Sequence, residues 1–149
     1  MASVKQLRRA QGWIIRQPHR IFLDPKCENK IDLFGSRKDL EIHKIAVANG
    51  AARACLEHFA GGSGSLVVSP SEDPVQPEPF CIGNPAGDDD FVHVFDEAHL
   101  HIVMQELDTI NDFVEYLRSR KKVIVNKNLV VSASEEDLLA SYFRVPLGE

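Results

Sequence analysis

The chain has 149 residues, 44% of them hydrophobic and 26% charged, shares that are typical of a soluble globular protein and exclude a disordered or fibrous one. No apolar run approaches the roughly 20 residues of a membrane-spanning helix, and the arginines near Met1 interrupt any signal-peptide pattern, so we expect a cytoplasmic protein with no membrane partner. The net charge of −5 hides an asymmetry that bears on partners: residues 1–60 hold eleven basic and six acidic side chains, and residues 61–149 hold six basic and sixteen acidic ones.

The first sixty residues predict two helices and two strands. In chain order these are a helix over 3–17, a short strand over 19–23, a loop over 24–40, a strand over 41–49 and a helix over 51–60. The first helix carries an apolar stripe at helical spacing and ends before Pro18, because the residue before a proline is pushed out of the α region. The second strand is apolar on both faces, as in a parallel or mixed sheet.

The middle of the chain predicts strands separated by turns. Glycines at 61–64 end the preceding helix, a strand follows over 65–69, and a further strand is expected over 91–95. Between these strands, residues 70–90 contain five prolines and two glycines, which predicts a long proline-rich surface loop.

The last third predicts three helices. Asp96, Thr109 and Ser134 are N-cap residues that open helices over 97–107, over 110–122 and from 135 onward. Two short strands over 123–125 and 129–131 would lie between the last two helices. The predicted buried positions follow helical spacing: Leu100, Val103, Met104 and Leu107; Ile110, Phe113, Val114 and Leu117; Leu138, Leu139, Tyr142 and Phe143.

This order of elements predicts a mixed α/β fold. We expect a central mixed sheet of about four to six strands with helices packed on it. Residues 1–149 would form a single α/β domain.

Three adjacent carboxylates provide weak candidates for a metal-dependent catalytic site. Asp88, Asp89 and Asp90 precede a strand that carries His93, and carboxylate oxygens are ligands for Mg²⁺. Neighbouring residues on a strand point to opposite faces, however, so at most two of the three would converge. A solvated loop end is the favoured interpretation, and we predict no metal ligands and no cofactor, with Mg²⁺ as the alternative.

The basic N-terminal part of the chain, called the basic front below, provides weak candidates for nucleic-acid contacts. These are Lys5, Arg8, Arg9, Arg16 and Arg20. A positive helix face contacts phosphates without sequence preference. An ordinary solvated face, or a face that docks onto the acidic half, is favoured over that interpretation.

Other short patterns do not define a site. The glycines at 61–64 follow a helix and lack the lysine of a phosphate-binding loop. Residues 24–26 and 28–30 match the (D/E)xK half of a nuclease site, but Pro25 argues against the central strand on which that chemistry depends. Cys27, Cys55 and Cys81 are far apart, which favours idle thiols in a reducing compartment.

Several stretches resemble the later part of a bacterial protein family of uncharacterised function. They are residues 5–14, 20–24, 61–66, 91–96, 106–113 and 135–140. Longer members carry an upstream segment similar to PD-(D/E)xK nucleases. The resemblance implies that the helix over 3–17 follows the catalytic strand, with Lys5 or Gln6 nearest the active centre. The catalytic carboxylates of the family would lie before Met1, so we expect a shortened member or fragment without that chemistry.

The resulting prediction is a non-catalytic structural or interaction module of a nuclease-like bacterial family. A homo-oligomer or a protein partner would bind through the N-terminal helix, because Leu7, Trp13 and Ile14 would otherwise form an exposed apolar patch. The alternative is a metal-dependent nuclease or phosphodiesterase, with nucleic acid held by the basic front.

Overall fold

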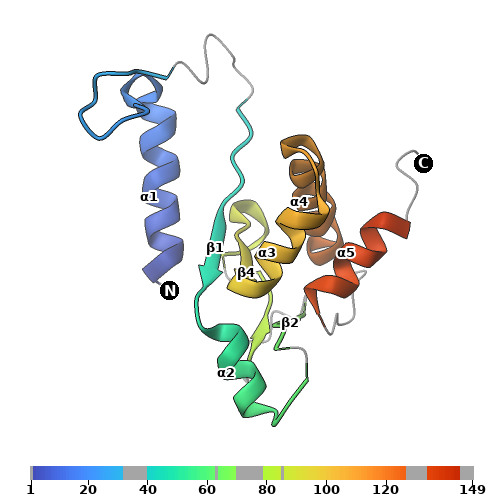
Figure 1. The fold of residues 1–149 in the computed structure, drawn as a ribbon. Helices are drawn as coiled ribbons and strands as arrows, with labels where there is room; N and C mark the ends of the chain where they lie inside the picture. The colour runs from blue at the N-terminus through green and yellow to red at the C-terminus, as the bar shows by residue number, and fades with distance from the viewer. Residues whose placement is uncertain are drawn as a thin grey trace. The chain divides into compact units, whose positions relative to one another are not determined.

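The computed structural model describes residues 2–31, 40–62, 64–69, 79–84, 86–126 and 134–144 (Figure 1). The chain divides into two compact units, residues 1–44 and residues 45–149. The single-domain assignment stays a prediction, and the expected strand over 129–131 lies outside the described residues.

The described residues of the first unit form one long helix followed by a turn. Helix α1 spans Ala2–Arg16, which confirms the predicted helix. The predicted strand over 19–23 is wrong: Pro18–Arg20 form the 3-10 helix η1, since the proline at its first position fixes a helical φ. The chain then reverses, with a single antiparallel bridge between Phe22 and Lys30.

The carboxylate of Asp24 organises this turn. It accepts hydrogen bonds from the backbone N–H groups of Glu28 at 3.2 Å and Asn29 at 2.7 Å. Both (D/E)xK patterns therefore lie in a turn rather than on a central strand, and the described part of the predicted loop is confirmed.

Two parallel strand pairs lie within the described residues of the second unit. Strand β1 (Ile45–Ala48) pairs with β4 (His93–Asp96), and β2 (Val67–Val68) pairs with β3 (Cys81–Ile82). The mixed α/β class is confirmed, but in the described residues these two-stranded sheets replace the expected sheet of four to six strands. The predicted loop over 70–90 is wrong at β3 and at the 3-10 helix η2 (Asp88–Asp90).

The described part of this unit also contains four α-helices: α2 (Ala51–His58), α3 (Glu97–Glu106), α4 (Ile110–Val125) and α5 (Glu135–Arg144). The caps were predicted correctly, because Asp96, Thr109 and Ser134 each accept a hydrogen bond from the backbone N–H three residues later. The predicted strand over 123–125 is wrong: α4 continues to Val125, since Ile124 belongs to its buried face.

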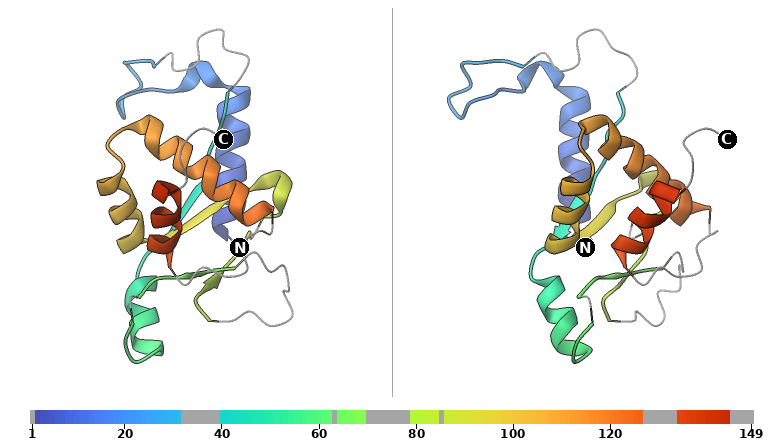
Figure 2. Two further views of the ribbon diagram at one scale, coloured as in Figure 1. Left: turned by 90° about the vertical axis from the view of Figure 1, so that its right-hand side faces the viewer. Right: turned by 45° about the vertical axis from the view of Figure 1, so that its right-hand side comes forward.

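Helices α3, α4 and α5 are grouped together in all the views of Figures 1 and 2. They enclose a core that includes Phe95 of β4, Val103 and Leu107 of α3, Tyr116 and Leu117 of α4, and Leu139 of α5. A second cluster joins Val68, Phe91, Ile124 and Leu138. Among the described helices, none combines the length and hydropathy that a membrane crossing requires.

Three predicted core positions are exposed instead. Met104, Ile110 and Phe143 keep 61%, 85% and 58% of their surface accessible. Each of these residues lies beside the face of its helix that packs on the core and is not part of that face. Their apolar side chains therefore remain in contact with solvent.

Candidate functional site

Five polar side chains are buried where β4 ends and where α3 and α5 begin. They are Asp96, His99, Tyr116, Arg120 and Glu135, each exposed by 3% or less. We call them the buried polar centre. Burial of so many polar groups is tolerated only where each finds a partner.

Asp96 and His99 form one half of this centre. Asp96 is the buried last residue of β4; its backbone is extended and its side chain caps α3, so the third helical residue, His99, is placed beside it. The His99 ring Nδ1 lies 2.7 Å from Asp96 Oδ1 and 2.8 Å from Oδ2. A carboxylate accepts and does not donate, so Nδ1 carries the proton.

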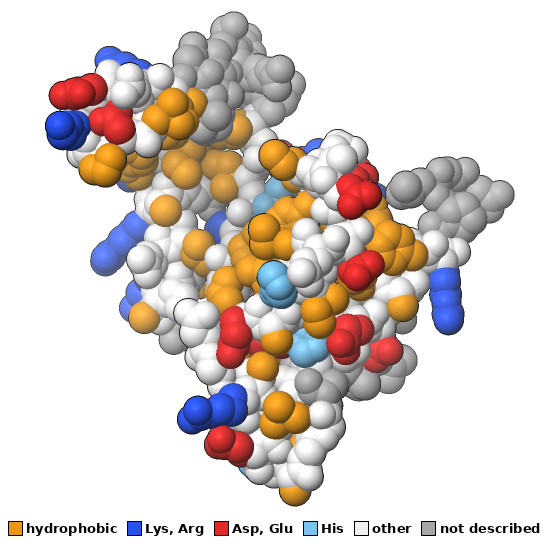
Figure 3. All heavy atoms as spheres, in the orientation of Figure 1, with side chains coloured by type: hydrophobic (Ala, Val, Ile, Leu, Met, Phe, Trp, Pro, Cys, Tyr) orange, Lys and Arg blue, Asp and Glu red, His pale blue; other side chains and the backbone are white. Residues whose placement is uncertain are grey.

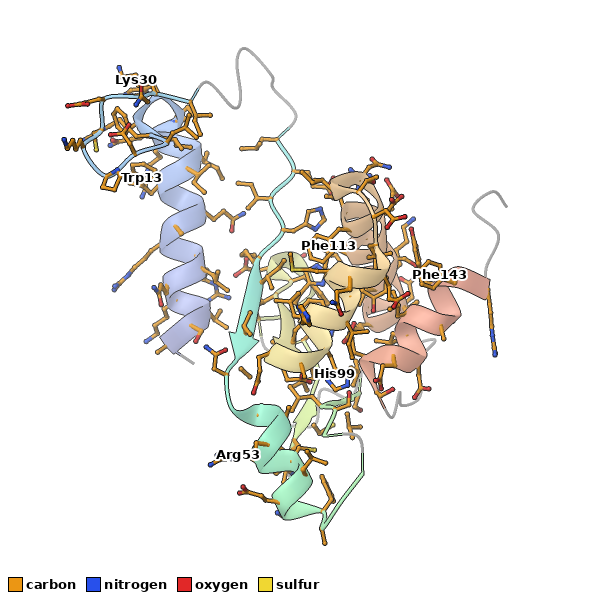
Figure 4. The ribbon with its side chains drawn as sticks, viewed as in Figure 1. Trp13, Lys30, Arg53, His99, Phe113 and Phe143 are labelled. Carbon is orange, nitrogen blue, oxygen red and sulfur yellow. The ribbon has the colours of Figure 1, made fainter. Side chains whose placement is uncertain are left out.

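The other ring nitrogen of His99 points toward α5. Nε2 lies 3.5 Å from Oε2 of Glu136, whose side chain is 48% exposed. The imidazole thus bridges the cap of α3 and the first turn of α5, and Figure 4 shows it between these helices.

Arg120, Glu135 and Tyr116 form the second half. The guanidinium donates to Glu135 Oε1 at 2.7 Å and to Oε2 at 2.9 Å, and donates to the Val94 carbonyl at 3.0 Å. It also lies 4.5 Å from the centre of the Phe95 ring. The Tyr116 hydroxyl donates to Glu135 Oε1 at 2.5 Å, and burial, followed by the Glu135 charge, raises the pKa of Tyr116 well above its ordinary value of 10.

Residues 65 and 66 connect the two halves. The Ser65 hydroxyl oxygen accepts from the backbone N–H of Glu135 at 3.2 Å, and the Leu66 N–H donates to Asp96 Oδ2 at 3.5 Å. The Cys55 thiol donates to the Ser65 carbonyl at 3.4 Å. Burial, and then the Asp96 charge, raises the pKa of Cys55, which disfavours its nucleophilic thiolate.

This arrangement links β4, α3, α4 and α5 through side chains that use their polar atoms on one another. These donors and acceptors are covered by the surrounding protein. The centre therefore acts first as a structural brace, with Glu136 at its solvent edge.

The predicted catalytic residues lie in η2, for the three aspartates, and at the first position of β4, for His93. Asp89 is exposed, Asp90 is half-buried, and the side chain of Asp88 lies outside the described residues. His93 is 2% exposed and packs beside the rings of Phe91 and Phe95, with ring centres 4.8 and 6.4 Å away. No three His, Cys, Asp or Glu side chains within the described ranges could hold one metal ion, and the Mg²⁺ alternative stays a prediction.

The predicted basic residues lie together in the first unit. Lys5, Arg8, Arg9 and Arg16 are exposed on α1, and Arg20 follows in η1, where it donates to the Gln17 side chain at 3.1 Å. Figure 3 shows Lys and Arg side chains projecting from α1.

Two apolar side chains are exposed among these cations. Trp13 keeps 40% and Ile15 keeps 59% of its surface accessible. Lys5, Arg9, Trp13 and Arg16 fall on one face at helical spacing. Ile15 lies two residues after Trp13 and therefore points to nearly the opposite side of the helix. We define the α1 surface as Lys5, Arg9, Trp13 and Arg16.

The buried polar centre was missed in the sequence, although two signals were present. His99 stands three residues after a cap residue, a position whose side chain folds back onto the cap. Arg120 falls on the same stripe as Tyr116, Leu117 and Ile124 once α4 is continued to Val125. The Glu135 partner was not recognisable, because pairing across the gap between α4 and α5 depends on the tertiary fold.

No protein family, curated protein or solved structure matches this chain.

Proposed function

We propose that the chain is a non-catalytic interaction module, related to a nuclease-like bacterial family, that self-associates through the α1 surface. The observation that carries the proposal is the exposed side chain of Trp13 on a helix whose charged residues are all basic. Tryptophan and arginine are the residue types that contribute most often to binding hot spots.

The composition of the first unit supports this proposal. In residues 2–31 and 40–44, Val4 is the one hydrophobic side chain that is buried. A helix with so little buried apolar area gains stability when a partner removes Trp13 from water.

The buried polar centre supports a non-catalytic role, because its polar groups bind one another inside the second unit. The nuclease or phosphodiesterase alternative, with Mg²⁺ and bound nucleic acid, stays a prediction, and no contact within the described residues favours it over the module.

Sedimentation velocity over a range of protein concentrations tests the proposal. We expect the wild-type weight-average mass to rise with concentration. Trp13→Ala should weaken association about thirtyfold, the equivalent of a hot-spot loss of about 2 kcal/mol. The matched control is Leu23→Ala, which removes an apolar side chain that is 72% exposed in the same unit but outside α1. A wild-type protein that stays monomeric at every concentration contradicts the proposal.

A further inference from the structure

The second unit carries an exposed apolar patch at the outer edge of its core. Leu100, Phe113 and Tyr142 are half-buried against the core of α3, α4 and α5. The exposed side chains of Met104, Ile110 and Phe143 enlarge this apolar surface toward solvent. We call these six residues the acceptor patch.

The members of the patch are neighbours on their helices. Met104 follows Leu100 by one helical turn, and Phe113 follows Ile110 by three residues. The rings of Tyr142 and Phe143 have their centres 5.7 Å apart. Figure 3 shows hydrophobic side chains gathered over α3, α4 and α5, and Figure 4 shows Phe113 and Phe143 on that same side.

Acidic residues border the α3 and α4 part of the acceptor patch, and the exposed Arg144 follows Phe143 at its α5 end. Glu106 and Asp108 are exposed in the segment that joins Met104 to Ile110. Burial raises the pKa of Tyr142, and the charges of Asp112 and Glu115 raise it further, which places those carboxylates near the ring. No Lys or Arg occurs between Gly61 and Leu117. The charged residues that α3 and the first turns of α4 place around the acceptor patch are therefore all acidic.

The α1 surface and the acceptor patch have complementary chemistry. The first offers the exposed Trp13 flanked by cations, and the second offers exposed apolar side chains with carboxylates along its α3 and α4 part. An amphipathic helix that lays anchors such as Trp13 against an apolar helical surface is a recurrent mode of recognition. Opposite charges around such a contact set its orientation and its association rate.

A contact between two α1 helices is electrostatically unfavourable. Before Asp24 the chain has no acidic residue, so two copies of α1 would bring basic side chains against one another. Like charges at close range in an interface oppose binding.

We infer that the α1 surface of one copy docks on the acceptor patch of a second copy. This inference rests on the proposed function and adds the site on the partner. The contact is heterologous, because it joins two different surfaces, and each copy keeps one unused surface unless a ring or a reciprocal dimer closes. Self-association should then weaken with added salt, since the charges lie at an exposed rim.

Two complementary variants test the inference. The donor variant Arg9→Glu/Trp13→Ala disables the α1 surface, and the acceptor variant Met104→Ala/Ile110→Ala disables the patch. All four positions are exposed, so both variants should keep the wild-type circular dichroism spectrum. Ile110→Ala alone is a second acceptor variant, since that side chain is 85% exposed.

Each variant alone should sediment as a monomer. Mixed in equal amounts, they should form a one-to-one heterodimer and nothing larger, because one intact α1 surface meets one intact patch. The outcomes separate the two proposals. If the acceptor variant still self-associates, or the mixture stays monomeric while wild type associates through Trp13, the acceptor patch is wrong and the module stands. If the wild-type protein never associates, the proposed self-association and the proposed docking are both wrong. A basic helix of another protein is then the remaining candidate to bind the acceptor patch.

Discussion

Replacing Arg120 should cost far more stability than replacing Arg118, two residues away on the same helix. The Arg120 side chain is 2% exposed and its two contacts with Glu135 are 2.7 and 2.9 Å long. Arg118 is 42% exposed and pairs with Glu115 at the surface. Arg120→Ala leaves the Glu135 carboxylate buried without its cation, which costs about 3–5 kcal/mol. Arg118→Ala breaks a surface pair worth about 0–1 kcal/mol.

Urea unfolding followed by far-UV circular dichroism measures this difference. With a typical slope, Arg120→Ala should lower the unfolding midpoint by about 2 M, a large part of the stability of a small domain. Trp13 fluorescence is a poor probe here, because that residue lies in the first unit. The double variant Arg120→Met/Glu135→Leu removes both charges and should recover part of the loss, because the Tyr116 hydroxyl and the Val94 carbonyl then lose their partners. If Arg120→Ala is no less stable than Arg118→Ala, the pair is not the brace that we describe.

Three further results are expected. In the native protein a thiol reagent should modify the exposed Cys27 quickly and the buried Cys55 only on unfolding; equal rates would contradict the burial and raised pKa of Cys55. Folding raises the pKa of Tyr116, so the stability that this shift contributes is complete below pH 10, the unfolded pKa, and is lost as the pH rises further. The absorbance change of tyrosinate formation at Tyr116 should therefore coincide with alkaline unfolding. Ionisation of Tyr116 in the folded protein would refute this. Gly62 and Gly64 both have positive φ, and Gly62→Ala should cost roughly 1 kcal/mol of unfolding free energy. Gly64→Ala should cost more, because a Cβ at position 64 would lie 2.9 Å from a carbonyl oxygen. Equal urea midpoints for the two variants would contradict this close contact.

Local signals were sufficient for most of the helices. The caps at Asp96, Thr109 and Ser134 depend on a hydroxyl or carboxylate next to a helical run, and all three were predicted from neighbouring residues alone. The end of α4 was not, because Val123, Ile124 and Val125 are β-branched and favour a strand when the packing of the helix is unknown.

Long-range pairings were beyond the reach of the sequence. Strand β3 consists of two residues in a proline-rich segment, and its pairing with β2 depends on the tertiary fold. The same holds for the Arg120–Glu135 contact, since nothing in either helix specifies which faces meet. The basic and acidic halves, in contrast, could be read directly from the sequence, and they supply the charges of both surfaces that we propose to interact.

The parallel pairing of β1 with β4 has a consequence for how the second unit folds. The two strands are separated in the chain by α2, β2 and β3, so a large loop must close before their hydrogen bonds form. Helices α3, α4 and α5 are consecutive and can associate sooner. During synthesis from the N-terminus, β1 leaves the ribosome well before its partner exists. The apolar strand β1 therefore stays unpaired until β4 has been synthesised. We expect the pairing of β1 with β4 to be the slowest step of refolding and the step at which incorrect association begins.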